Sequence, residues 1–244
     1  MSIETMIVVF CGALAGGLVN GLTGFGTGLT ALGIWLYAIE PATAATLVLI
    51  CSIVSQLQTI RMIWYAIDWK RVLAFVIPGV LGVPIGTLIL PHLDPRVFKI
   101  GVGLLLIAYP LYALLRRRAH HSDWGGRPAD AVIGFGGGIL GGISGLSGIL
   151  AVIWTDIRGW PRDQRRSVLQ TYNVTMLTLA LAAHAASGMV TRKVGAAAII
   201  AVPGSIGAAW LGAYIYRRLA DHTYQRIIML LLLFSGIMLV WTSR

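Results

Sequence analysis

Eight long apolar segments follow one another along this chain, and they constrain its fold more than any other feature. Most of them are 20 to 26 residues long, which suits a helix that crosses a hydrocarbon core about 30 Å thick. The apolar residues form continuous runs and do not alternate with polar ones, as the strands of a membrane barrel would. The sequence therefore predicts an all-α, polytopic membrane protein. The segments are residues 5–39, 41–66, 72–92, 95–115, 129–157, 167–190, 194–216 and 222–241.

Composition supports a lipid bilayer as the surroundings of the protein. Of the 244 residues, 57% are hydrophobic and 11% are charged, whereas an ordinary soluble domain has about 25% charged residues. The mean hydropathy is +0.81. These values exclude a disordered chain, a coiled coil, a secreted disulfide scaffold and almost any soluble enzyme.

The net charge of +10 does not indicate nucleic-acid binding. The basic residues form short clusters beside apolar runs, such as Arg116–Arg118 and Arg162–Arg166, and no basic stripe carries interleaved aromatics. Clusters of this kind orient membrane proteins. The two cysteines, Cys11 and Cys51, lie inside apolar runs without metal-ligand spacing. Neither a metal nor a cofactor is predicted.

The two halves of the chain resemble each other. Gly21-Leu22-Thr23-Gly24 matches Gly142-Ile143-Ser144-Gly145, and Pro78-Gly79-Val80-Leu81-Gly82 matches Pro203-Gly204-Ser205-Ile206-Gly207. Internal repeats are typical of transporters, with the substrate site between the repeats. We expect repeat 1 at 1–115, a cytoplasmic linker at 116–128 and repeat 2 at 129–244.

Each repeat opens with an apolar segment that is rich in glycine. The dense stretches are 20–28 and 136–148, and glycine disfavours a continuous helix by about 1 kcal/mol per residue relative to alanine. One interpretation is close helix packing through small residues. The other, which matched positions in two repeats favour, is a broken or re-entrant helix whose backbone lines a cavity.

Charge counting favours inverted repeats. If each glycine-rich segment returns to the side from which it entered, 14 of the 19 Lys and Arg residues gather on one side and 5 on the other. With eight full crossings the split would be 10 to 9. The positive-inside rule therefore predicts the re-entrant arrangement, with both termini outside.

The nine acidic residues all lie at or near segment ends, so no carboxylate is expected at the bilayer midplane, where cation-coupled carriers often place one. This pattern favours an anion as substrate, and the membrane potential could drive its export. Broken helices offer free backbone N–H groups and positive helix ends to an anion, and polar side chains lie close by. The candidate substrate-binding residues are Asn20, Thr23, Gly24, Phe25, Gly26, Thr27, Gln56, Ser144, Gly145, Ser147, Gly148, Gln170 and Asn173.

Two other kinds of function stay open at this point. Gly145-Leu146-Ser147-Gly148 matches the Gly-x-Ser-Gly motif of intramembrane serine proteases, with His184 as the base of a Ser-His dyad. A passive anion channel is the other alternative. Arg61 lies inside an apolar stretch, and we expect it to snorkel to the membrane surface beside Trp64 and Tyr65.

Several of these motifs together resemble the TauE/SafE family of membrane permeases. They are the opening Gly21-Leu22-Thr23-Gly24-Phe25-Gly26, the helix that ends at Arg61 before Ile67-Asp68-Trp69, and the Pro78 to Gly82 helix with its echo in repeat 2. The resemblance covers nearly the whole chain. It implies a multi-pass permease of a bacterial inner membrane that exports sulfite, an organosulfonate or another small sulfur-containing anion. A homodimer is left open as its assembled form.

Overall fold

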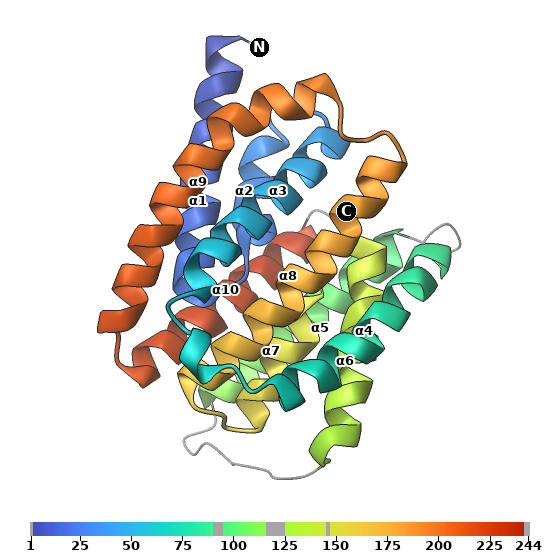
Figure 1. Cartoon of the computed structure of the whole chain (residues 1–244), viewed down its shortest axis with the longest axis vertical. Coiled ribbons are helices and arrows are strands. Elements are labelled where there is room, and N and C mark those ends of the chain that lie inside the picture. Colours follow the sequence, from blue (N-terminus) through green and yellow to red (C-terminus); the bar gives the residue numbers. More distant parts are fainter. Residues whose placement is uncertain (1, 90–94, 116–124, 145–146, 242–244) are drawn as a thin grey trace.

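All regular secondary structure in the described part of the chain is helical (Figure 1). The structure is a computed structural model, and it describes residues 2–89, 95–115, 125–144 and 147–241. The helices are α1 (Ile3–Thr23), α2 (Thr27–Trp35), α3 (Pro41–Ile60), the short 3-10 helix η1 (Trp64–Ala66), α4 (Trp69–Ile89), α5 (Pro95–Leu115), α6 (Gly126–Ser144), α7 (Gly148–Ile157), α8 (Arg162–Ala186), α9 (Arg192–Arg218) and α10 (Asp221–Trp241).

The helices have the length and the surface of membrane spans. Within the described residues, four stretches are long and apolar enough to cross a bilayer: Ile3–Thr23, Ala42–Ile60, Trp69–Gly86 and Arg192–Arg218. Large apolar side chains cover their outer faces, and Leu81 and Ile199 are 63% and 77% exposed. Such surface is stable in lipid and not in water. The predicted all-α membrane protein is confirmed.

The first glycine-rich segment forms a helical hairpin. The chain leaves the helix at Gly24 and Gly26, whose φ angles of +80° and +95° are readily adopted only by glycine. The second arm, α2, then runs back along α1, since Trp35 Nε1 donates to the Val9 carbonyl near the start of α1 at 2.9 Å. The segment predicted at 5–39 is therefore two antiparallel helices of unequal length.

The second glycine-rich segment has the same plan. Its helices α6 and α7 lie on either side of residues 145–146, and α7 runs back along α6. Trp154 Nε1 near the end of α7 donates to the Asp130 carboxylate near the start of α6 at 2.7 Å, and a Cβ on Gly141 would lie 3.0 Å from the Ser147 side chain.

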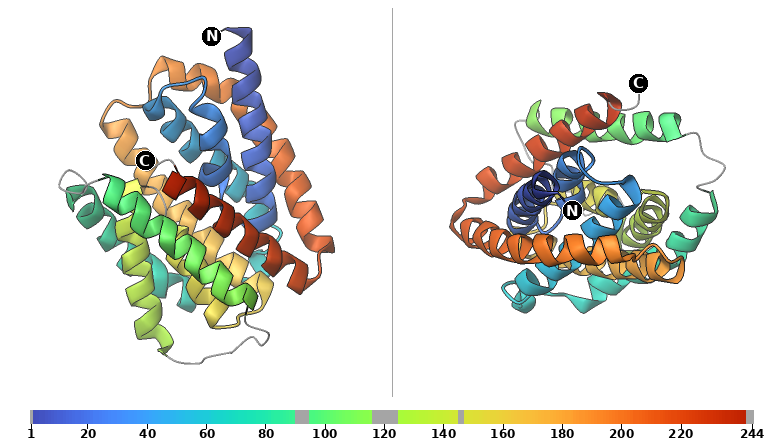
Figure 2. Two further views of the ribbon diagram at one scale, coloured as in Figure 1. Left: turned by 180° about the vertical axis from the view of Figure 1, so that it is seen from behind. Right: turned by 90° about the horizontal axis from the view of Figure 1, so that it is seen from above.

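The long arms of the two hairpins pack against helices of the opposite half of the chain. Helix α1 lies along α9, and α6 lies along α4 (Figure 1); α5 and α10 lie side by side (Figure 2). The backbones approach closely at glycines: a Cβ on Gly21 would lie 2.1 Å from the Ala209 carbonyl oxygen, and one on Gly138 would lie 2.1 Å from that of Gly79. The glycines thus allow close packing of helix backbones at Gly21 and Gly138 and end helix α1 at Gly24.

Some helix boundaries differ from the sequence prediction. Helix α3 ends at Ile60 instead of continuing to residue 66, and η1 follows it. Helix α8 begins at Arg162, five residues before the predicted start, because its first turns bury charged side chains that sequence hydropathy assigns to a loop. Helix α6 takes in residues 126–128 of the predicted linker, and 116–124 lie outside the described residues.

We expect Gly138→Val to reduce stability sharply, because its side chain would separate the backbones of α4 and α6. Overpacking of this kind typically costs about 1–3 kcal/mol. The measurement is thermal unfolding of the purified protein in detergent. Gly207→Val is the matched control, since no atom lies within 4 Å of a Cβ there. Equal melting temperatures for the two variants would contradict the close packing.

Candidate substrate site between the two hairpins

A small cavity lies where the two hairpins meet α3 and α8. Its volume is about 70 Å³. The first turn of α2, the middle of α3, the first turn of α7 and the middle of α8 each contribute to its wall. The lining residues are Phe25, Gly26, Thr27, Gly28, Leu29, Val48, Ser52, Gln56, Gly148, Ile149, Asn173 and Leu177.

Two helix N-termini face this cavity. Helices α2 and α7 have 9 and 10 residues, and their first turns are part of the lining. No side chain caps the N-terminus of either helix: Gly26 has no side chain, and the Ser147 side chain accepts no hydrogen bond from α7. First-turn N–H groups have no partner within a helix, and the aligned peptide dipoles make this end positive. Both ends are suited to hold an anion.

Polar side chains surround the cavity at buried positions. Ser147 Oγ donates to Asn173 Oδ1 at 3.1 Å, and Asn20 Nδ2 donates to Thr27 Oγ1 at 2.6 Å. Asn20, Thr27, Ser147 and Asn173 are all at most 5% exposed. The hydrogen bonds fix the first turns of α2 and α7 against α1 and α8 around the cavity.

Gln56 and Gln170 connect the cavity to the rest of the protein interior. Gln170 Nε2 donates to the Gln56 carbonyl at 2.7 Å and to Thr59 Oγ1 at 2.6 Å. Since a carbonyl only accepts, these bonds fix the orientation of the Gln170 amide. Gln56 is 1% exposed, and its Oε1 has no hydrogen-bond partner. An unpartnered buried polar atom beside a cavity is a feature of a ligand site.

The structure brings most of the sequence candidates to this place. Phe25, Gly26, Thr27, Gln56, Gly148 and Asn173 line the cavity. Asn20, Ser147 and Gln170 bond to lining residues, and Thr23 Oγ1 donates to the Phe25 carbonyl at 2.6 Å. Gly24 precedes the lining residues and faces Arg166 and Gln170. The side chain of Ser144 and the whole of Gly145 lie outside the described residues.

Sequence reasoning missed Arg166. It was counted among the cytoplasmic surface cations, but it is 1% exposed. Arg166 Nη2 donates to the Gly21 carbonyl at 2.6 Å and Nη1 to the Leu22 carbonyl at 3.3 Å, and the guanidinium lies 4.0 Å from the centre of the Tyr216 ring. The signal was its spacing: residues 166, 170 and 173 recur at i, i+4 and i+7, which places them on one helix face.

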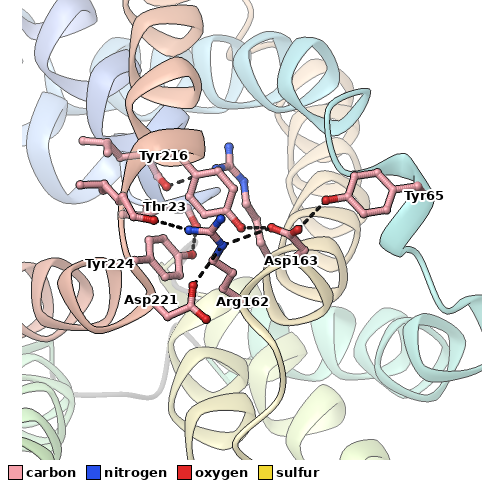
Figure 3. A network of polar contacts seen from close by, with 10 residues as sticks. Thr23, Tyr65, Arg162, Asp163, Tyr216, Asp221 and Tyr224 are labelled. Carbon is pink, nitrogen blue, oxygen red and sulfur yellow. Dashed lines mark hydrogen bonds and ion pairs between the residues drawn. The ribbon is translucent and has the colours of Figure 1, made fainter.

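A cluster of polar contacts joins the two halves of the chain at the end of the molecule that holds the α9–α10 turn (Figure 3). Tyr65, which follows α3, donates to Asp163 at 2.5 Å, and Tyr216 of α9 donates to the same carboxylate. Tyr224 of α10 donates to the Thr23 carbonyl at 3.3 Å. The last turn of α1 is thus connected to the ends of α8, α9 and α10.

The structure does not assemble the Ser-His dyad of the protease alternative. Ser147 bonds to Asn173, whereas His184 Nδ1 lies 3.0 Å from Thr46 Oγ1. Asn173 and His184 are 184 − 173 = 11 residues apart on α8, which separates them by about 16 Å along the helix axis.

Arg61, which the sequence places inside an apolar stretch, is exposed in the structure.

Broken helices that meet around a small cavity inside a helical membrane protein are the architecture of a secondary transporter. The family model "Sulfite exporter TauE/SafE" matches residues 8–239, so the chain belongs to the TauE/SafE family. The protein is a membrane transporter of the sulfite exporter type and not an enzyme. Searches of the curated proteins and of the solved structures gave no match.

Proposed function

We propose that this permease exports a small oxyanion, with sulfite as the favoured substrate, across a bacterial inner membrane. The observation that carries the proposal is the pair of helix N-termini, α2 and α7, that face one cavity. Two positive helix ends favour one negative charge between them. Among the described residues, no Asp or Glu lines the cavity to oppose this charge.

The size of the cavity is compatible with a small anion. Its volume of about 70 Å³ leaves room for more than one water molecule. Sulfite, an inorganic oxyanion, needs less space than an organosulfonate such as sulfoacetate, and we favour sulfite for this reason.

The proposal includes two inverted repeats, each with a re-entrant hairpin. Its support is the reciprocal packing, in which the hairpin of each half contacts the long helix of the other. At one end of the molecule, Arg162 contacts the α9–α10 turn and Asp163. Elsewhere, Glu40 before α3 pairs with Lys193 at the start of α9 at 3.1 Å. We assign the first end to the cytoplasm, following the charge count.

Reporter fusions test this topology. A reporter that folds only in the periplasm should be active when it is fused after Arg244 and inactive when it is inserted at Ser122, two positions outside the described residues. A cytoplasmic reporter provides the control and should give the reverse pattern. The same result at both positions would contradict the inverted arrangement, and periplasmic activity at Ser122 with none after Arg244 would contradict the assigned orientation.

Ligand-dependent stabilisation tests the substrate. The thermal unfolding of the purified protein is measured with sulfite, thiosulfate, sulfate, sulfoacetate, taurine and acetate. We expect sulfite to give the largest increase in melting temperature, since a ligand at 100 times its Kd adds about 2.7 kcal/mol to the stability of the folded state. Taurine, which carries no net charge, is the control. Stabilisation by taurine but by none of the anions would contradict an anion site.

A further inference from the structure

Arg166 is a buried cation without a contacting counter-ion. Its guanidinium contacts two backbone carbonyls and the Tyr216 ring, and no carboxylate of the described residues forms an ion pair with it. The nearby acids have other partners. Asp156 pairs with Arg165 at 2.5 Å. Asp163 accepts hydrogen bonds from Tyr65 and Tyr216 and pairs with Arg162, and it attracts the Arg166 guanidinium without an ion-pair contact.

One N–H group of Arg166 faces the break between α1 and α2. Arg166 Nε is buried and has no hydrogen-bond partner. It lies 3.7 Å from the point that a Cβ on Gly24 would occupy, and Gln170 Oε1, also buried and unpartnered, lies 3.7 Å from the same point. Gly24 directly precedes Phe25 and Gly26, which line the cavity. Arg166 itself does not line the cavity, and its free donor lies beside Gly24, the residue that leads into the lining.

The other nitrogens of Arg166 hold it in place. Nη1 and Nη2 bond to the last carbonyls of α1, where the helix dipole is negative and favours a cation. These contacts, with the Tyr216 ring, fix the guanidinium plane while Nε stays free. A buried charged residue of a membrane protein with no direct ion-pair contact is a candidate functional group, because its burial is costly unless an opposite charge contacts it.

We propose that Arg166 binds the substrate oxyanion through its Nε–H group, on the side of the cavity toward the α9–α10 turn, and thereby makes the permease select anions. This inference rests on the proposed function. A guanidinium suits an oxyanion because its N–H groups form directional, charge-assisted hydrogen bonds with oxygen acceptors. Gln170 Oε1 beside it would accept from an O–H group, so a singly protonated oxyanion such as hydrogensulfite fits this position better than a fully ionised one.

Sulfite uptake into proteoliposomes by Arg166→Gln and Arg166→Lys tests the inference. We expect Arg166→Gln to raise the KM for sulfite about 10- to 100-fold, the usual effect of removing a charge-assisted hydrogen bond. Arg166→Lys keeps the charge but loses the rigid, planar arrangement of N–H donors. We expect its KM to lie between those of the wild type and Arg166→Gln. Arg162→Gln is the matched control: Arg162 belongs to the same cluster and is 27% exposed, and its KM should change less than 3-fold.

The outcomes separate this inference from the proposed function. A role of Arg166 in capping α1 alone would lower the melting temperature or kcat of both variants and leave KM unchanged, which would overturn the inference. If Arg166→Gln does not fold, Arg166→Lys decides: a raised KM at unchanged kcat supports substrate contact, and an unchanged KM refutes it. Wild-type protein that neither transports sulfite nor is stabilised by it would instead refute the proposed substrate.

Discussion

Gly148→Val is expected to lower anion transport about 100-fold or more while the protein still folds and inserts. A Cβ at this position would lie 2.9 Å from both Asn173 Nδ2 and Asn173 Oδ1. The side chain would displace Asn173, fill the cavity and shield the first-turn N–H groups of α7. Loss of two hydrogen bonds to a charged group, at about 1.5–3 kcal/mol each, accounts for this magnitude.

The measurement is initial flux per folded molecule in proteoliposomes. The control is Gly33→Val in the other short helix, α2, where no atom lies within 4 Å of a Cβ, and its flux should match the wild type. Gly24→Val is a poorer test, because the φ of +80° at Gly24 would strain any side chain there. Flux from Gly148→Val within a few-fold of the wild type would refute the cavity as the substrate site.

A membrane potential is expected to drive the flux directly. At 100 mV the potential contributes about 2.3 kcal/mol per unit charge, so the equilibrium concentration ratio of a monoanion should change about 50-fold. The structural reason is that the cavity lining, as far as the structure describes it, includes no carboxylate. In addition, broken-helix transporters hold coupling cations at the carbonyls where a helix ends. At the end of α1 these carbonyls accept hydrogen bonds from Arg166 and Tyr224 instead.

Proteoliposomes loaded with sulfite test this, with valinomycin and a potassium gradient to set the voltage. Liposomes with equal potassium on both sides are the control. A pH gradient imposed at zero voltage should change the flux only through the protonation of sulfite itself. Flux that ignores the voltage and follows the imposed pH gradient would contradict a potential-driven mechanism.

The sequence was sufficient to predict features that depend on neighbouring residues. Long apolar runs and few charges predicted the all-helical membrane fold, because transfer into lipid depends on composition over about twenty residues. The glycines around Gly24 indicated the helix break, since only glycine readily adopts the φ angles found there. The glycine-rich stretches and the polar side chains of the following helices also predicted six of the cavity-lining residues, Phe25, Gly26, Thr27, Gln56, Gly148 and Asn173.

Tertiary structure decided which of these features meet. That the N-termini of α2 and α7 face one cavity depends on the packing of each hairpin against the other half of the chain, and no local pattern encodes this packing. The same holds for Arg166. In the sequence it is one of several arginines beside an apolar run, and in the fold it is buried against the last turn of α1. Burial of a charge depends on partners distant in sequence, here 145 residues away, and hydropathy averaged over neighbours cannot contain them.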